Sequence, residues 1–277
     1  MDPHSGIEKD DIVAYSSFDK SSKRKVAMRT LLLIAVAAVL LIFLAVAVIG
    51  RYFKVDTIVI DGTEKYSFSE LCECADLKEG KLIFLFSQKT IERELKQRFP
   101  YIKSVEVTKK YPSSVYLSIR EEKALYYVTA EGEYFVITDQ LKVLERYTEK
   151  ERLLARYPEL KEVRTTLIYK IVAPQKIEFQ QKKDQKYIEK VLCALADWKG
   201  FDKIQSVDIS NKFDITVEYD NRISVEMGNR YDFDKKLNMV TAIIASYSEK
   251  AEGSINVKNV EEGIARLTDP EDEKTPE

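Results

Sequence analysis

Residues 31–49 form an unbroken run of nineteen Leu, Ile, Val, Ala and Phe side chains, in a chain of which 32% is charged. A helix rises about 1.5 Å per residue, so this run spans roughly the 30 Å hydrocarbon core of a bilayer. The pattern predicts one transmembrane helix over residues 30–50. A cleaved signal peptide is the alternative, because Ala45-Val46-Ala47 resembles a cleavage site. The length of the run and its late start favour a retained anchor.

The charges on either side of this run predict its orientation. Basic residues crowd the N-terminal side, whereas Arg51 and Lys54 on the other side are offset by nearby acidic residues. Because an excess of Lys and Arg stays in the cytoplasm, we expect residues 1–29 to be a disordered tail inside the cell. The basic residues of this tail are Lys20, Lys23, Arg24, Lys25 and Arg29.

Residues 54–122 have the pattern of a strand, two helices and a hairpin. Alternating apolar positions predict a strand over 55–61 and a hairpin over 102–119. Ser67 starts an S-x-x-E capping box before one amphipathic helix, and Ser87 is a candidate N-cap for a second. The core residues expected for this unit are Val59, Leu71, Leu95, Ile102, Val107, Leu117 and Ile119.

Residues 123–267 are mostly β in pattern, with two helices. The charged stretch 145–157 is compatible with a helix whose apolar face is not evident, and the strand order over 145–180 stays open. Residues 268–277 are acidic and predict a disordered tail. The other expected elements are a hairpin over 125–137 continued by 143–144, strands over 165–172, 176–179, 204–209, 213–219, 222–227 and 254–260, and helices over 184–197 and from an N-cap at Asp232.

The chemistry available outside the membrane is limited. The only histidine is His4, in the predicted cytoplasmic tail, so no Ser-His or Cys-His pair and no His ligand for zinc is expected outside. Carboxylate pairs such as Glu121-Glu122 are expected to be solvated in a chain this charged. A net charge of −2 argues against a nucleic-acid partner. We expect no cofactor, metal or small-molecule substrate.

Cysteine and aromatic residues fit structural roles better than chemical ones. Cys72 and Cys74 lie two apart on a predicted helix and cannot bond to each other. A Cys72–Cys193 bridge remains open, but buried thiols are favoured. Trp198 fits either a half-buried plug or a partner contact. The strand aromatics Tyr126, Tyr127, Tyr134 and Phe135 are expected to pack across strands rather than form a ligand cage.

Specific motifs add a family resemblance. Phe99-Pro100-Tyr101-Ile102, followed by Tyr111-Pro112-Ser113-Ser114-Val115, resembles a POTRA domain, and the whole chain resembles the FtsQ/DivIB family of bacterial division proteins. Val225-Glu226-Met227-Gly228, Lys235-Lys236-Leu237 and Ser254-Ile255-Asn256-Val257 also match. The chain departs from the family in two places. Glu121-Glu122-Lys123-Ala124 lacks the usual proline, and Leu141 stands where a turn glycine would be usual.

The resemblance implies an α+β fold. A single transmembrane helix would be followed by a POTRA-like β-α-α-β-β domain and a β-rich domain with two helices and a C-terminal edge strand. It also implies a non-enzymatic scaffold at the division septum, which binds FtsL-like and FtsB/DivIC-like membrane proteins and helps regulate septal peptidoglycan synthesis. The residues alone leave open a membrane-anchored extracytoplasmic enzyme or cell-wall-binding module.

The expected partner site is the last predicted strand. Since no further strand is evident after it, one edge would expose unpaired N–H and C=O groups, which invite an added strand. An ordinary edge blunted by Lys258 is the alternative. The resemblance favours partner binding, because relatives receive a strand from FtsB/DivIC in this region. The candidate residues are Ser254, Ile255, Asn256, Val257, Lys258, Asn259 and Val260.

Overall fold

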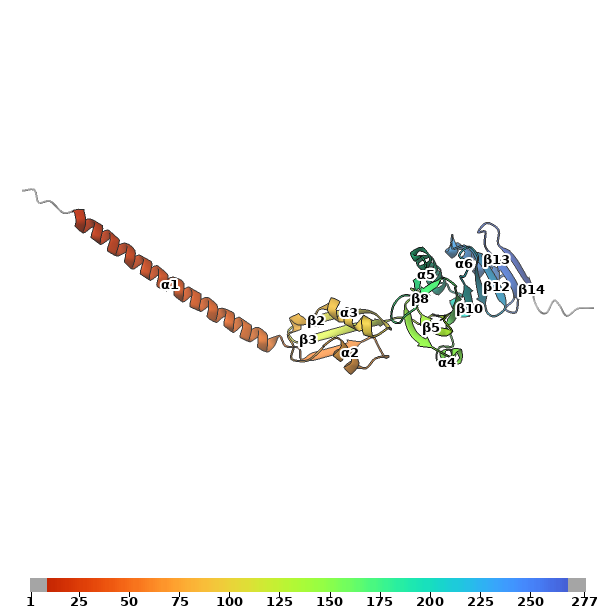
Figure 1. Cartoon of the computed structure of the whole chain (residues 1–277), viewed down its shortest axis with the longest axis horizontal. Helices are drawn as coiled ribbons and strands as arrows, with labels where there is room; N and C mark the ends of the chain where they lie inside the picture. The colour runs from red at the N-terminus through yellow and green to blue at the C-terminus, as the bar shows by residue number, and fades with distance from the viewer. Residues whose placement is uncertain (1–8, 269–277) are drawn as a thin grey trace, which may run out of the picture. The chain divides into compact units, whose positions relative to one another are not determined.

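The computed structural model describes residues 9–268 (Figure 1). Its first element is the long helix α1 (Lys9–Tyr52), within which Met28–Tyr52 is long and apolar enough to cross a membrane. The predicted span 30–50 lies inside this stretch. The helix continues back to Lys9, where the sequence predicted a disordered tail; residues 1–8 lie outside the described range. Residues 9–29 contain neither Gly nor Pro, so nothing in them interrupts a helix that the apolar run has already nucleated.

The next elements follow the predicted β-α-α-β-β order. The three strands form a sheet in the order β1-β3-β2. The predicted capping box is present, because the Ser67 N–H donates to Glu70 Oε2 at 2.9 Å and the Glu70 N–H donates to Ser67 Oγ at 3.4 Å. The elements are β1 (Thr57–Asp61), α2 (Phe68–Cys74), a short 3-10 helix (Ile83–Leu85), α3 (Gln88–Arg98), β2 (Ile102–Lys110) and β3 (Ser114–Glu121).

Most of the predicted core of this region is buried. Leu71, Leu95, Ile102, Leu117 and Ile119 are each at most 3% exposed.

Two predicted core positions are wrong. Val59 is 38% exposed, because the neighbouring Ile58 and Ile60 are the half-buried residues of β1 and Val59 alternates to the other side. Val107 is only half-buried: burial along β2 is complete at Ile102 and Val105 and declines toward the end of the strand.

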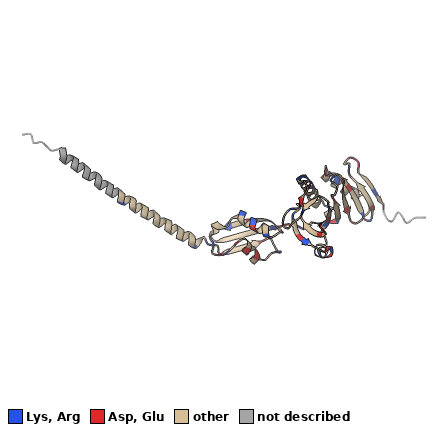
Figure 2. Ribbon diagram, in the orientation of Figure 1, with Lys and Arg blue, Asp and Glu red and all other residues tan. Residues whose placement is uncertain are grey.

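The remaining strands build one large sheet, in the order β14-β13-β12-β11-β10-β7-β4-β5-β6. Three neighbouring pairs are parallel, namely β12–β13, β10–β7 and β4–β7, and the others are antiparallel. Basic and acidic residues are interspersed in the regions that follow α1 (Figure 2). The strands are β4 (Tyr126–Ala130), β5 (Glu133–Ile137), β6 (Val143–Tyr147), β7 (Lys161–Arg164), β10 (Ile204–Asp208), β11 (Ile215–Tyr219), β12 (Ile223–Gly228), β13 (Glu252–Asn256) and β14 (Ile264–Thr268).

Residues 145–180, for which the sequence left the strand order open, contribute an interior strand to this sheet. Strand β7 lies between β10 and β4 and is parallel to both. The predicted strands over 165–172 and 176–179 shorten to β8 (Ile168–Lys170) and β9 (Glu178–Phe179), which pair only with each other. The charged stretch contains the short helix α4 (Lys150–Arg156), whose Leu153 is fully buried.

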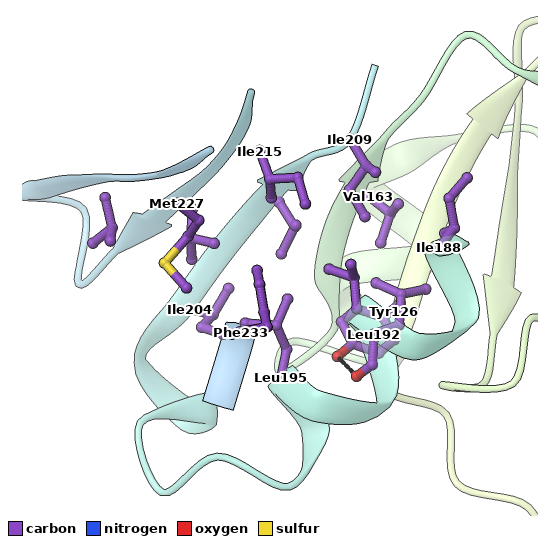
Figure 3. Packing of buried hydrophobic residues seen from close by; sticks show 14 of the residues in the cluster. Tyr126, Val163, Ile188, Leu192, Leu195, Ile204, Ile209, Ile215, Met227 and Phe233 are labelled. Carbon is purple, nitrogen blue, oxygen red and sulfur yellow. Dashed lines mark hydrogen bonds between the residues drawn. The ribbon is translucent and has the colours of Figure 1, made fainter. Parts of the chain in front are cut away.

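Two helices contribute their apolar faces to the main core. They are α5 (Lys182–Ala196) and α6 (Phe233–Ala245). Ile188, Leu192 and Leu195 of α5 pack with Tyr126 and other strand residues (Figure 3). The Tyr126 hydroxyl donates to the Leu192 carbonyl at 2.8 Å, which fixes β4 to this helix and satisfies a buried polar group. Of the four strand aromatics expected to pack across strands, Tyr126, Tyr127 and Phe135 are at most 5% exposed. Tyr134 is half-buried beside Tyr127, with ring centroids 6.4 Å apart.

Two turn residues behave differently from the usual sequence rules. Leu141 has a positive φ of 63°, and its side chain is 1% exposed. The left-handed conformation costs about 1–2 kcal/mol, and burial of a leucine offsets a cost of this size. Asp232 also has a positive φ and makes no side-chain cap, contrary to prediction; its carboxylate instead pairs with Lys235 at 2.7 Å.

The three cysteines form no disulfide. The Cys193 thiol points at Asp139, 3.6 Å from its carbonyl oxygen, and burial raises the pKa of this thiol to about 11. The thiol of Cys74 lies 3.5 Å from the Glu94 carbonyl oxygen. Trp198 is half-buried, and its indole N–H donates to Thr241 Oγ1 at 2.8 Å. Across residues 9–268, no cluster of three or more His, Cys, Asp or Glu side chains could hold a metal ion.

Candidate partner-binding site

The segment predicted as the closing strand is not at the edge of the sheet. Ser254, Ile255 and Asn256 belong to β13, which lies between β12 and β14. The expectation that no later strand covers this segment is therefore wrong. Strand β14 pairs with β13 in antiparallel register, with Ser254 opposite Arg266. Sequence reasoning overlooked β14 because its inner face carries only Ala265 and Leu267, a weak alternation, although Gly263 just before it was a usable turn signal.

The other four predicted site residues form the connection between β13 and β14. Val257 is fully buried and Val260 is half-buried. The Lys258 ammonium lies 2.9 Å from Asp214 Oδ1 and 3.0 Å from Glu226 Oε2, and these hydrogen bonds raise the pKa of Lys258. Asn259 Oδ1 accepts a hydrogen bond from the Glu261 N–H at 3.1 Å.

The structural roles of these seven residues are local. Ile255 is fully buried, and Asn256 Nδ2 donates to Glu226 Oε2 at 2.8 Å on the other face of β13. Backbone groups on both sides of β13 are used in pairing with its neighbours, so this segment cannot accept an added strand without losing β14.

The sheet has two edge strands, β14 and β6, and β14 is the edge next to the predicted segment. The Gly253 N–H donates to the Arg222 carbonyl and the Val257 N–H donates to the Glu226 carbonyl, so the odd-numbered residues of β13 point their backbone groups toward β12. Successive residues of a strand point these groups in opposite directions, so even-numbered residues such as Ser254 bond to β14. The hydrogen-bonded pairs between β13 and β14 are then Glu252 with Thr268, Ser254 with Arg266, and Asn256 with Ile264.

It follows that Ala265 and Leu267 turn their N–H and C=O groups away from β13. In the sheet formed by the described residues, β14 has β13 as its one neighbour, so these groups face an open edge. The side chains of Ala265 and Leu267 pack against the main core, while Ile264 is 53% exposed and Arg266 is exposed. The edge thus offers main-chain pairing flanked by one apolar and one cationic side chain.

Gly253 allows β14 to approach β13 closely. Its φ is +140°, and a Cβ at this position would lie 2.0 Å from the Arg266 carbonyl oxygen. No other residue fits there without displacing β14. At the start of β14, a Cβ on Gly263 would lie 2.6 Å from the Met239 sulfur of α6.

Comparisons with known proteins agree with this architecture. The family model described as "POTRA domain, FtsQ-type" matches residues 53–122. The cell division protein DivIB of Clostridium botulinum (strain Hall) is 23% identical over 246 residues, covering 84% of this chain and 88% of the relative. These findings support the FtsQ/DivIB family for this chain. DivIB of Clostridium tetani is 26% identical over 211 residues, covering 74% of this chain and 76% of that protein. DivIB of Bacillus subtilis is 27% identical over 127 residues, covering 45% and 48%.

The resemblance to the FtsQ/DivIB family is supported, and the α+β fold expected from the sequence is confirmed. The C-terminal edge strand is β14, one strand later than the segment 254–260 predicted for it. The relatives are named as cell division proteins, which supports a role in division. The apolar helix Met28–Tyr52 is consistent with a single membrane anchor.

Proposed function

We propose that this protein is a non-enzymatic scaffold of the divisome, which binds FtsL-like and FtsB/DivIC-like proteins outside the membrane and helps regulate septal peptidoglycan synthesis. The observation that carries the proposal is the open edge of β14, at Ala265 and Leu267. Exposed edges invite added strands, and this one lies in a protein whose relatives are named for cell division.

The proposed arrangement is a single membrane pass with the N-terminus inside. The basic residues between Lys20 and Arg29 support this orientation. Outside the membrane, residues 54–122 would form the POTRA-like domain and residues 123–267 the β domain, followed by the acidic segment 268–277. The division septum is the proposed location, and a fluorescently tagged protein should collect at mid-cell; uniform membrane fluorescence throughout division would contradict this.

In the proposed complex, a segment of an FtsB/DivIC-like partner adds to β14 as a further strand. Its main chain would pair with Ala265 and Leu267, while Ile264 and Arg266 lie on the opposite face and would help to set register. Under this proposal, the partner-binding residues would lie one strand later than the segment 254–260.

A proline at Ala265 tests the proposal. Proline removes the N–H that points to the open edge, and edge strands tolerate proline at such positions. Ala265→Pro should therefore keep the melting temperature near the wild-type value and lower capture of a purified FtsB/DivIC-like partner by about tenfold or more, which is about 1.4 kcal/mol. Ala265→Ser, which keeps the N–H, is the matched control. A folded Ala265→Pro variant that captures the partner as tightly as wild type would place the interface elsewhere.

A further inference from the structure

A second surface of the β-rich region has the features of a binding site. It is a cavity of about 400 Å³ bordered by the N-terminal half of α5, the connection between β10 and β11, and the connection between β12 and α6. Its volume falls in the range of pockets that hold small ligands. The residues that matter to the argument are Lys183, Lys186, Lys190, Phe213, Arg230 and Tyr231.

Tyr187 forms a fixed base for this cavity. Its hydroxyl accepts a hydrogen bond from the Arg230 N–H at 3.1 Å and donates one to the Lys212 carbonyl. One side chain of α5 therefore holds both connections in place. Burial raises the pKa of Tyr187, so its hydroxyl stays protonated and able to donate.

Two large aromatic side chains are left in solvent at this cavity. Phe213 is 70% exposed and Tyr231 is 69% exposed, although each lies in a short connection of a region with a well-filled core. Single exposed aromatics are common on protein surfaces, but two at one cavity form an apolar wall that a ligand could cover.

Five cations line the same cavity, namely Lys183, Lys186, Lys190, Lys212 and Arg230. Lys183, Lys186 and Lys190 recur at intervals of three and four, so they lie along one face of α5. The Arg230 guanidinium lies over two rings, 5.4 Å from the centroid of Tyr187 and 5.7 Å from that of Tyr231, which restrains it.

Apart from Lys212, these cations lack acidic partners of their own. The described ion pairs include one at this cavity, Lys212 with the buried Asp184 at 3.5 Å. In the part of the chain that the structure describes, no ion pair involves Lys183, Lys186, Lys190 or Arg230. Elsewhere in the regions that follow α1, basic and acidic residues are interspersed (Figure 2). Several separate cations of this kind complement a chain of several anionic groups better than they complement one isolated anionic group.

The combination of charge and aromatic wall indicates the chemistry of the ligand. A bare polyanion would leave Phe213 and Tyr231 uncovered, and a purely apolar ligand would desolvate the cations without pairing them. We propose that this cavity binds an acidic segment of a partner protein, with its carboxylates on Lys186, Lys190 and Arg230 and an apolar side chain against Phe213 and Tyr231. The proposal does not depend on strand addition at β14.

The acidic segment of this chain itself is a poorer occupant. Residues 269–277 contain no aliphatic or aromatic side chain apart from two prolines. They also start at the wrong end of the sheet: Thr268 lies opposite Glu252 at the beginning of β13, whereas the cavity lies beyond Gly228 at the end of the parallel strand β12.

Peptide binding to the full-length protein in lipid nanodiscs tests the proposal by fluorescence anisotropy. The labelled probe has the sequence Glu-Asp-Leu-Glu-Phe-Glu-Asp, and its uncharged match is Gln-Asn-Leu-Gln-Phe-Gln-Asn. The acidic probe should bind saturably and more weakly as salt rises, and the uncharged probe should not bind. Arg230→Gln/Lys186→Gln should weaken binding by about tenfold or more. Lys170→Gln/Lys199→Gln, which removes two exposed cations that do not line the cavity, should change it less than about twofold.

Further binding measurements distinguish this cavity from other binding sites and other ligands. Phe213→Ala should weaken the probe severalfold, because the apolar wall is lost, and Ala265→Pro should leave binding unchanged. The proposal is overturned if the wild type shows no saturable binding, or if both double variants bind equally. It is also overturned if polyphosphate or Glu-Asp-Gly-Glu-Gly-Glu-Asp binds as tightly as the probe, since that would indicate a general polyanion surface. Much tighter binding after deletion of residues 269–277 would assign the cavity to the chain's own acidic segment.

Discussion

The Lys236 ammonium donates a hydrogen bond to the carbonyl oxygen of Met227 at 2.9 Å, from a side chain that is only 1% exposed. A second hydrogen bond reaches the Asn229 carbonyl at 2.8 Å. Burial lowers the pKa of this lysine. The buried cation thus satisfies the carbonyls at the end of β12 and in the connection that carries Arg230 and Tyr231, and it links α6 to that connection.

Replacing Lys236 by Met should destabilise the fold. The substitution keeps the length of the side chain but leaves the two carbonyls without their charged donor, and each such hydrogen bond contributes about 1.5–3 kcal/mol. We expect the free energy of unfolding to fall by roughly 2–5 kcal/mol in chemical denaturation. Lys235→Met on the exposed side of the same helix is the matched control and should change it by less than about 1 kcal/mol. Equal stabilities of the two variants would contradict this role for Lys236.

Glu145 should make stability depend on pH in the acid range. Its carboxylate accepts hydrogen bonds from the hydroxyls of Tyr147, Tyr101 and Tyr157 at 2.5, 2.7 and 2.8 Å. Burial alone would raise the pKa of Glu145, but these three hydrogen bonds outweigh burial and lower it below the ordinary value of 4.5. The folded carboxyl therefore binds fewer protons than the unfolded one, and its contribution is complete above about pH 4.5 and lost as the pH falls through the folded pKa.

The measurement is the melting temperature between pH 7 and pH 3. The wild-type protein should lose stability more steeply below pH 4.5 than Glu145→Gln, which has no carboxyl to protonate at this position. Glu131→Gln, at an exposed turn position, should follow the wild-type curve. Parallel curves for wild type and Glu145→Gln would show that the tyrosine cluster does not govern acid sensitivity.

Residues 54–122 should fold on their own. Leu71 of α2 and Leu95 of α3 are each at most 1% exposed, and the family model matches nearly the same range. A purified 54–122 fragment should melt cooperatively, and Leu95→Ala should cost roughly 2–5 kcal/mol through the cavity it leaves. Leu85→Ala, at a residue that is 69% exposed, is the control and should cost much less. A fragment that melts without a cooperative transition would mean that the domain boundary is wrong.

Local periodicity was sufficient to predict the position of an element where that element has a strong apolar face. The helix α5 and the strands β10, β11 and β12 lie close to their predicted positions, because alternation or a repeat of three and four recurs over several turns or residues. Strand β7 was missed, since its four residues Lys161–Arg164 include three charged ones and their burial comes from neighbours distant in sequence. Leu141 shows the same limit, because the need for a buried side chain there overrides the preference for glycine.

The candidate site depended on a tertiary relationship that the sequence pattern does not contain. The segment 254–260 reads as a closing strand, and only the pairing of β13 with both β12 and β14 shows that its edges are used. The cavity beside Arg230 likewise joins side chains from three segments that are separate in sequence, namely α5, the connection between β10 and β11, and the connection between β12 and α6. The sequence contains the aromatic and basic residues, but its pattern does not indicate that they lie close together in the fold.

Gly253→Ala should detach β14 selectively. The new Cβ would lie 2.0 Å from the Arg266 carbonyl oxygen, and a contact that close with backbone can be relieved only by moving one strand away from the other. The main core depends on β10, β11, β12 and the helices α5 and α6, so we expect it to persist. Gly132→Ala is the matched control: it imposes a similar left-handed strain, with a φ of +80°, but its Cβ meets nothing within 4 Å. Hydrogen exchange of the Arg266 amide, which bonds to β13, should accelerate in Gly253→Ala and stay slow in Gly132→Ala, because exchange follows local opening. Slow exchange at Arg266 in Gly253→Ala would show that the close approach of the two strands is not required.

If the partner binds by adding a strand to β14, Gly253→Ala should also abolish capture of the FtsB/DivIC-like partner, because the strand that receives the partner is detached.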